Sequence, residues 1–494
     1  MGFLNAPIAE PRKPWREDPM GRVVGLVTTA IAGVLLGIQY WTPNKRVIPV
    51  VAALLVFGVA WRLSMVAAIN VLVFLLPYPK GTVFGSTNLA FILLVFVIWL
   101  LRLSLRMSPP ARSSPMNVPI FGLVLWYILS FYNVRTEAGL ELAIVNFELF
   151  ASCILLYYLI INSIHTQADL RRLHMAQMVT ALGVFLIAAW ELHFPGRVLI
   201  PGLLDFTATV GNDFNTRNVR VGASFRDYEL LSEFCGITLL LTSFLFLRAR
   251  SQTRRVLLGL FGILNLYTMF TTVTRGVIVA LAASIPYLFY VIRRRLNPVR
   301  FMSAVSLILA LAVGMNFLVA HYTNSGNMFE RLGQTKVVHG IVPEARAGPW
   351  TNAWKRSLVH PLIGQGPYYG DLPGYETWWP HNVYLFIANL VGFPGLGFYL
   401  LILWGLFSLL RPVVDDLHHE SYADAYLIVA RTQLFVFMIN ELKIDYLRNP
   451  VYQFQIWQLF GTWTAAYLVS RDYGVRAGYF RAQPETKPSR RLAA

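Results

Sequence analysis

The stretch VYLFIANLVGFPGLGFYLLILWGLFSLL, residues 383–410, contains no charged side chain. A transmembrane α-helix needs about 20 consecutive apolar residues, so this run is long enough to cross a bilayer with residues to spare. Gly392, Pro394, Gly395 and Gly397 lie inside it, and we expect them to divide it into a half-helix and a full helix. Runs of the same kind recur along the chain, which indicates a membrane protein.

The composition supports this interpretation. Of the 494 residues, 56% are hydrophobic and only 14% are charged, whereas soluble domains carry about 25% charged residues. The net charge is +17, but the basic residues fall mostly in short loops between apolar runs. Such a distribution argues against a nucleic-acid-binding protein, whose basic residues gather on one face. It follows the positive-inside rule of membrane proteins and favours contact with anionic membrane lipids.

The apolar runs predict an all-α fold, a polytopic transmembrane helical bundle with about 12–14 spans. Continuous runs exclude a β-barrel, because barrel strands alternate apolar and polar residues. The predicted spans lie near residues 22–41, 47–62, 64–78, 87–105, 117–134, 139–162, 173–193, 228–247, 256–273, 276–292, 301–320, 383–410, 424–442 and 452–470.

Lysine and arginine counts orient the bundle, with the basic loops and both termini on the cytoplasmic side. The chain then divides into a cytoplasmic N-terminal arm (1–21), transmembrane helices (22–193) and a first long outer loop (194–227). Further transmembrane helices follow, with an outer Thr-Arg-Gly turn (228–320), and then a large outer loop that carries short helices (321–382). The last parts are the C-terminal transmembrane helices (383–470) and a cytoplasmic tail (471–494).

The large outer loop is rich in tryptophan and tyrosine. Residues 350–360 predict an amphipathic helix ended by Pro361, with Trp350, Trp354, Leu358 and Ala353 on one side. A glycine-rich turn, residues 364–370, follows it. The loop is either a structure that rests on the membrane surface or a lid that closes over a substrate.

Several cations share the predicted outer face: Arg220, Arg275, Arg346 and His381. An arginine at the end of a span is often a membrane anchor. Arg275, however, lies in a very short outer turn, where positive residues are normally depleted. Because guanidinium groups match phosphate oxygens, these arginines predict a binding site for a diphosphate whose lipid tail stays in the bilayer.

His381 precedes a predicted span and is either an inert hydrogen-bonded histidine or a proton acceptor. Nearby arginines would lower its pKa and keep it neutral, as a base requires. Glu229 and Glu233, one helical turn apart, either orient an arginine and the acceptor or form structural ion pairs. Trp378 and Trp379 belong to an interfacial aromatic belt or stack on a sugar. No metal-ligand spacing and no nucleotide or hydrolase motif is present, so we expect no metal and no cofactor.

An ordered set of motifs resembles the signature domain of O-antigen ligases and O-antigen polymerases. Thr274-Arg275-Gly276 resembles the Ser/Thr-Arg-Gly element of that family, and the segment 220–225, RVGASF, resembles its upstream Arg-x-x-Gly-x-Phe element. The resemblance covers about residues 215–410. It departs from the family at Arg226-Asp227, where many relatives carry Asn-Pro-Asn. The remaining motifs are FERLG (329–333), Arg346 with Trp350, HPLIGQG (360–366), HNVYL (381–385) and GFPG (392–395).

The resemblance implies a glycosyltransferase of the bacterial inner membrane whose active site faces the periplasm. Such an enzyme moves a glycan from an undecaprenyl-diphosphate donor to lipid A–core in a ligase, or to a second lipid-linked glycan in a polymerase. His381 would be the base that activates the acceptor hydroxyl, and Arg275 and Arg346, assisted by Arg220, would bind the diphosphate.

Five further residues are candidates either for contact with the acceptor or for support of the groups that contact it: Asn382, Glu229, Glu233, Trp378 and Trp379. We expect a single displacement with inversion at the anomeric carbon, and no expectation arises for the oligomeric state. The alternatives to a ligase are an O-antigen or exopolysaccharide polymerase, a polysaccharide transporter and a non-catalytic assembly factor of a polysaccharide pathway.

Overall fold

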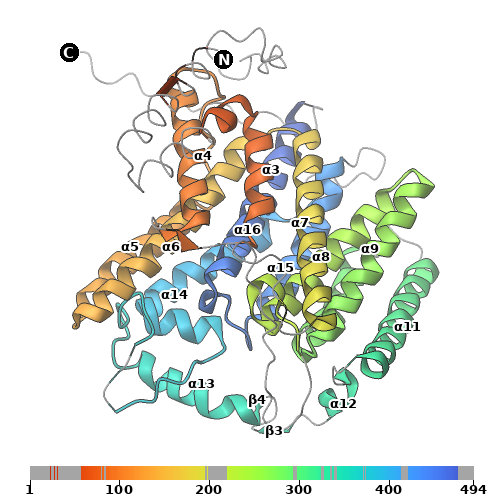
Figure 1. Ribbon diagram of the computed structural model, residues 1–494. Helices are drawn as coiled ribbons and strands as arrows, with labels where there is room; N and C mark the ends of the chain where they lie inside the picture. Colours follow the sequence, from red (N-terminus) through yellow and green to blue (C-terminus); the bar gives the residue numbers. More distant parts are fainter. Residues whose placement is uncertain are drawn as a thin grey trace.

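The computed structural model describes an α-helical bundle (Figure 1). The residues described are 57–78, 81–82, 85–194, 197, 220–292, 298–323, 327–333, 336–338, 342–370, 372, 374–412 and 421–476, together with 23, 27, 30 and 31. Most of the predicted span 22–41, most of the first outer loop and part of the span 47–62 lie outside the described residues, as do the predicted N-terminal arm (1–21) and residues 477–494 of the predicted tail.

Fourteen α-helices are assigned in the described ranges, with short 3-10 helices between some of them. The α-helices are α3 (Met65–Leu75), α4 (Thr87–Ser104), α5 (Asn117–Ser130), α6 (Glu137–Ser163), α7 (Gln167–His193), α8 (Tyr228–Arg248), α9 (Gln252–Thr271), α10 (Arg275–Ile292), α11 (Pro298–Tyr322), α12 (Met328–Gly333), α13 (Glu344–Ser357), α14 (Val383–Leu409), α15 (Tyr422–Asn440) and α16 (Pro450–Arg476). The 3-10 helices are η2 (Phe131–Asn133), η3 (Ala223–Phe225) and η5 (Tyr446–Arg448). Two antiparallel pairs of two-residue strands complete the description: β1 (Gly81–Thr82) with β2 (Gly85–Ser86), and β3 (Val337–Val338) with β4 (Val342–Pro343).

Six of these helices are long and apolar enough to cross a membrane: α6, α7, α8, the Val305–Tyr322 part of α11, α14 and α15. Four shorter apolar helices cover Met65–Leu75, Asn88–Ser104, Asn117–Asn133 and Arg275–Val291. The predicted all-α, multi-pass membrane fold is therefore confirmed. The total of 12–14 spans stays a prediction, because α9 and α16 coincide with predicted spans but are not among the six.

The break predicted within residues 383–410 is present in α14. Gly392 has φ 75° and ψ 178°, which interrupts the helix. The loop before α14 fills the interruption: Gln365 N–H donates to the Asn389 carbonyl at 2.8 Å, and Phe393 N–H donates to the Pro361 carbonyl at 2.8 Å. A Cβ at position 392 would lie 2.6 Å from the Leu362 carbonyl, so only glycine fits the break and the loop together.

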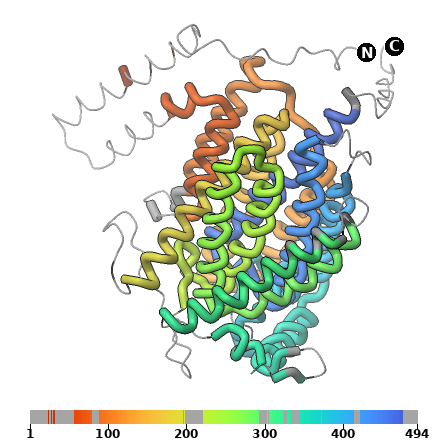
Figure 2. The backbone as a smooth tube through the Cα atoms, turned by 90° about the vertical axis from the view of Figure 1, so that its right-hand side faces the viewer, coloured from red at the N-terminus to blue at the C-terminus, as the bar shows by residue number. Residues whose placement is uncertain are grey.

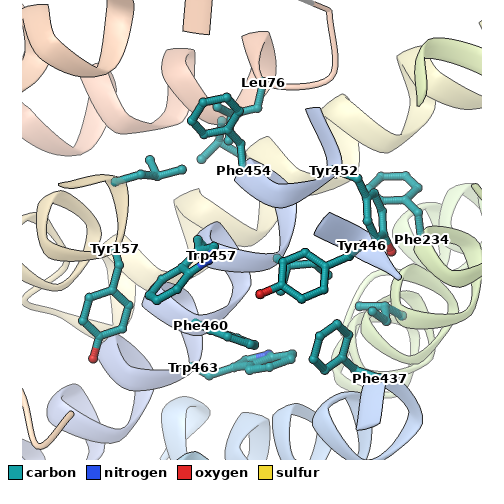
Figure 3. Close-up of a cluster of buried hydrophobic side chains, with 14 of the residues drawn as sticks. Leu76, Tyr157, Phe234, Phe437, Tyr446, Tyr452, Phe454, Trp457, Phe460 and Trp463 are labelled. Carbon is teal, nitrogen blue, oxygen red and sulfur yellow. The ribbon is translucent and has the colours of Figure 1, made fainter. Parts of the chain in front are cut away.

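The centre of the bundle is formed around α16, which packs against α6, α15 and α14. Figure 3 shows its aromatic side chains interleaved with those of neighbouring helices, and Trp457, Phe460 and Trp463 are at most 1% exposed. Some buried polar groups are paired here; the Trp463 indole N–H, for example, donates to Gln433 Oε1 at 3.1 Å. Polar side chains of α16 are thus buried together with its aromatic side chains.

One end of the bundle carries α12, β3, β4 and α13, as both ribbon and tube views show (Figures 1 and 2). We call this end the α13 face. The helix α13 begins at Glu344 and ends at Ser357, so it starts earlier and stops sooner than the predicted helix 350–360. Trp354 and Leu358 are about half exposed, whereas Ala353 is fully buried. Ala353 therefore does not share their side, because one residue along a helix turns the side chain by about 100°.

The glycine-rich turn is folded onto α13 by one buried arginine. Arg356 donates to the Gly370 carbonyl at 2.6 Å, to Gln365 Oε1 at 3.0 Å and to the Glu376 carbonyl at 3.0 Å. Its guanidinium also lies 4.4 Å from the centre of the Tyr369 ring. This part of the large loop is consequently a fixed structure against which the candidate site is built.

Candidate functional site

Glu229, in the first turn of α8, joins three cationic or titratable side chains at the α13 face. Arg346 of α13 donates to its Oε1 at 3.0 Å, and Arg448 of η5 donates to its Oε2 at 2.8 Å. His381 Nδ1 lies 3.7 Å from the same Oε2. Residues from four separate parts of the chain therefore meet at one carboxylate. Glu229, Arg346 and His381 were predicted from the sequence as site residues, and Arg448 was not.

Arg448 also contacts His381 directly, with 2.6 Å between Nη1 and Nδ1. Its Nη2 forms an ion pair with Asp227 at 2.7 Å. Asp227 is at the same time the N-cap of α8, because its side chain accepts from Glu229 N–H and Leu230 N–H. The start of α8 thus fixes Asp227 and Glu229, and these carboxylates fix the guanidinium beside the imidazole.

His381 lies just before α14 with a left-handed backbone, φ 47°. Burial lowers the pKa of its imidazole to about 4; Arg346 and Arg448 act in the same direction, and Glu229 opposes them. The imidazole is therefore neutral at neutral pH, as expected for a base. Sequence reasoning named the arginines as the cause, but burial contributes more.

Arg275 begins α10 and stands next to a lysine that the sequence analysis did not single out. A Cβ on Gly276 would collide with the Lys443 ammonium, so the lysine lies directly on the Thr-Arg-Gly turn. Burial lowers the pKa of Lys443 to about 8, with Arg275 and Arg346 contributing to the decrease and Glu229 opposing it. Arg275, Arg346 and Lys443 together form a group of cations beside Glu229.

Arg220 supports the turn from behind. Its guanidinium donates to the Thr272 carbonyl at 2.9 Å and to Thr274 Oγ1 at 3.1 Å, and it stacks on the Tyr228 ring. Only 5% of Arg220 is exposed. The geometry therefore makes Arg220 a brace for the turn that presents Arg275; direct contact of Arg220 with a diphosphate stays a prediction.

Asn382 and Glu233 lie beneath these groups. Asn382 caps α14 by accepting from Leu385 N–H at 3.0 Å, and its amide donates to the Leu442 carbonyl at 2.8 Å. Glu233 is fully buried and accepts from Asn440 at 3.0 Å. Both residues tie α8, α14 and the connection after α15 to one another.

The two tryptophans before α14 differ in their surroundings. Trp379 packs against Tyr369 and Phe386, with ring centres 5.4 Å and 4.6 Å away. Trp378 is 52% exposed, and its carbonyl accepts from the Tyr369 hydroxyl. Of the pair, Trp378 is the more exposed and offers the larger surface to a membrane or a sugar.

The sequence analysis missed Arg448 and Lys443, and it noted Asp227 only as a departure from a motif. A usable signal was present. The connection between the last two predicted spans, residues 443–451, is short and is predicted to lie on the outer side, yet it holds Lys443, Asp445 and Arg448. Positive residues are depleted in short outer loops, so the argument applied to Arg275 applies equally to this connection.

Within the described ranges, no group of three or more His, Cys, Asp and Glu side chains is placed to hold a metal ion. Metal independence stays a prediction that activity measurements must test. The site instead combines fixed positive charges, a neutral imidazole and carboxylates that hold them in place.

Residues 260–400 match the family model described as O-antigen ligase. The matched segment contains Arg275, Arg346 and His381, and it lies within the region of resemblance found in the sequence. It does not include Glu229 or Arg448, which complete the site from outside it. No curated protein matches the chain.

Proposed function

Since this chain is a multi-pass membrane protein of the O-antigen ligase-like superfamily, we propose that it moves a glycan from an undecaprenyl-diphosphate donor to an acceptor hydroxyl. The transfer takes place at the periplasmic face of the bacterial inner membrane, which is the α13 face of the bundle. Glycosyltransferase activity in general follows from the family; the donor, the side and the mechanism are our proposal.

The observation that carries the proposal is the position of Glu229 between two kinds of chemistry. On one side of Glu229 lie the cations Arg346, Arg275 and Lys443, whose positive charges can bind the oxygens of a diphosphate. On the other side stands the neutral imidazole of His381. One carboxylate thus holds both a site for the leaving group and a base. A displacement at the anomeric carbon needs both of these groups.

The proposed step is a single displacement. His381 takes the proton of the acceptor hydroxyl while the hydroxyl oxygen forms a bond to the anomeric carbon of the donor. The bond between that carbon and the diphosphate oxygen breaks, and its electron pair stays on the diphosphate, where the cations stabilise the developing charge. Attack opposite to the leaving group inverts the anomeric configuration, and no metal takes part.

Two acceptors fit this scheme. Lipid A–core would make the protein a ligase, and a second lipid-linked glycan would make it a polymerase. We favour the ligase, because the His381-Asn382 and Arg346–Trp350 elements resemble those of ligases. Both acceptors should therefore be tested in the same assay.

The test is a reconstitution in proteoliposomes with a polyprenyl-diphosphate glycan and each acceptor in turn. We expect a glycosylated product with inverted configuration, formed in the presence of a chelator. His381→Ala and Arg275→Ala should each lower kcat by at least about 100-fold. A matched control is His321→Ala, because His321 is exposed at the end of α11 and its ring packs against Tyr322 rather than against the candidate site.

Several outcomes would contradict the proposal. Retention of configuration excludes the single displacement, and loss of product with chelator excludes the metal-free mechanism. Activity that persists in both His381→Ala and Arg275→Ala excludes the assigned site. Translocation of the donor without formation of a glycosidic bond would identify a transporter instead.

A further inference from the structure

In the neutral imidazole of His381, one ring nitrogen has a free lone pair, and this nitrogen accepts a hydrogen bond from Arg448. The two nitrogens, Arg448 Nη1 and His381 Nδ1, are 2.6 Å apart. A guanidinium has only N–H donors, so Nδ1 must be the acceptor of this hydrogen bond. The ring proton is therefore on Nε2, and Nδ1 is the only ring atom that can receive another proton.

Arg448 is itself held firmly. Its Nη2 lies 2.7 Å from Asp227 and 2.8 Å from Glu229, and 14% of its side chain is exposed. The helix η5 that carries it is capped by Asp445, which accepts from Leu447 N–H at 2.9 Å. Burial lowers the pKa of Arg448, but the carboxylates of Asp227 and Glu229 outweigh this effect and raise it, so the charge is permanent.

Without Arg448, the opposite tautomer would have a partner. A proton on His381 Nδ1 would face Glu229 Oε2, which is 3.7 Å away, and the lone pair would then move to Nε2. The guanidinium is the group that prevents this, because it leaves no room for a proton on Nδ1. Which ring nitrogen acts as the base thus depends on Arg448.

We infer that Arg448 is a positioning residue of the transfer reaction, which fixes the Nε2–H tautomer of His381 and makes Nδ1 the atom that receives the acceptor proton. The inference rests on the proposed function. The matched segment, residues 260–400, does not include Arg448. The assignment rests on the contacts of the Arg448 guanidinium.

The reaction follows from these contacts. The acceptor hydroxyl replaces the Arg448 N–H at Nδ1 and transfers its proton there as its oxygen bonds to the anomeric carbon. The electron pair of the breaking bond leaves with the diphosphate. Arg448 keeps its two bonds to Asp227 and Glu229 when it releases Nδ1. The new imidazolium N–H points to Glu229, whose negative charge stabilises it.

Three charged groups face His381: Glu229 from α8, Arg346 from α13 and Arg448 from η5. Burial is the main reason that the pKa of His381 lies at about 4, and Arg448 lowers it further. Removal of Arg448 should therefore raise this pKa. The acid limb of kcat/KM, which reports the free enzyme, should move to higher pH.

The direct experiment is ¹⁵N solid-state NMR of histidine-labelled protein in proteoliposomes, with the His381 signals assigned by their loss in His381→Gln. At pH 7, the wild-type protein should show a protonated Nε2 and an unprotonated Nδ1. In Arg448→Met, a population protonated at Nδ1 should appear, and titration should begin at higher pH. Arg448→Lys, which retains a charged donor, should restore part of the wild-type pattern.

The kinetic experiment uses the same variants. Arg448→Met should lower kcat about 100-fold, with a smaller change in the KM of the donor, and should shift the acid limb. A matched control is Arg112→Met. Arg112 forms an ion pair with Asp472 at 2.6 Å, with side-chain exposures of 18% and 26%, close to the 14% and 21% of Arg448 and Asp227. This variant should lose a similar pair yet keep the acid limb unchanged.

The inference fails if wild-type His381 carries its proton on Nδ1, a result that needs no variant other than His381→Gln, which serves to assign the signals. It also fails if Arg448→Met loses activity while the tautomer and the acid limb stay as they were, because Arg448 would then be only structural. The first result comes from the NMR spectra alone and does not depend on turnover. Activity that persists in His381→Ala would instead refute the proposed function, whatever the NMR spectra show.

Discussion

Backbone strain gathers around the candidate site. Ala223, Arg226, Val273 and His381 all have φ between 47° and 52°, a region that costs non-glycine residues about 1–3 kcal/mol each. The four residues belong to the three segments that present Asp227, Arg275 and the imidazole. Packing elsewhere in the bundle must offset this strain, which is consistent with a site held in a fixed geometry.

Gly276 offers a test of how closely Lys443 must approach the turn. In Gly276→Ala, the new Cβ would displace the flexible end of Lys443, while the helix itself gains up to about 1 kcal/mol. We expect the KM of the donor to rise about tenfold or more, because the free energy of one hydrogen bond to a charged group corresponds to such a factor. The unfolding temperature should be nearly unchanged. Gly314→Ala in α11 is the control, because nothing lies within 4 Å of its Cβ position; an equal KM increase there would contradict the explanation.

Lys443 should also make donor binding depend on pH. With a pKa of about 8, its ammonium is charged below that pH and neutral above it, so the affinity for an anionic donor should fall as the pH rises through 8. Lys443→Arg, whose charge persists, should keep its donor KM constant from pH 7 to about 9. Lys443→Met should have a high KM throughout. A wild-type KM that is flat across this range would count against a role for Lys443.

The sequence predicted Arg275, Arg346 and His381 because each follows from topology or a motif, and the structure connects all three through Glu229 and Lys443. It could not predict the contact between Arg448 and His381. That contact depends on how η5 folds back onto the start of α8, which no local pattern records. Arg220 is the opposite case. A sequence motif identified it as a site residue, but only the structure shows that its guanidinium donates to the turn at Thr272 and Thr274.

At the scale of elements, the break in α14 carries the clearest prediction. Gly392→Ala would force a side chain into φ 75° and against the Leu362 carbonyl, at a cost of about 2 kcal/mol or more. We expect a lower unfolding temperature and faster proteolysis of the loop at residues 358–370. Gly397→Ala is the matched control in the same helix, since its Cβ position is open. Equal stability of the two variants would show that the break is not required.

The positions of helices were easier to predict than their ends or faces. Glycine and proline within an apolar run indicated the break in α14 correctly, because those residues act locally. The start of α13 was missed because Glu344 to Pro349 lack an apolar period; they are helical through tertiary contacts such as that of Arg346 with Glu229. Local helix propensity is a weak predictor where tertiary contacts of this kind determine the conformation.

For the whole molecule, the orientation in the membrane can be tested with introduced cysteines. The native thiols, Cys153 and Cys235, are both buried and free, so they should react little. Lys355→Cys on α13 should be labelled by a membrane-impermeant maleimide in spheroplasts. Gln252→Cys, at the start of α9, should be labelled only after the membrane is opened. The reverse pattern would place the α13 face in the cytoplasm and exclude a periplasmic site.

The interrupted backbone of α14 has a consequence for how the protein is made. A helix whose carbonyls at Asn389 and Leu390 are satisfied by Gln365 and Gly366 cannot meet its hydrogen-bonding needs alone in lipid. Residues 361–366 precede α14 in the chain, so on the proposed topology the segment that completes the helix is translocated before α14 is inserted. On that topology, insertion of α14 would be coupled to translocation of its own preceding loop, and neither would be an independent step of biogenesis.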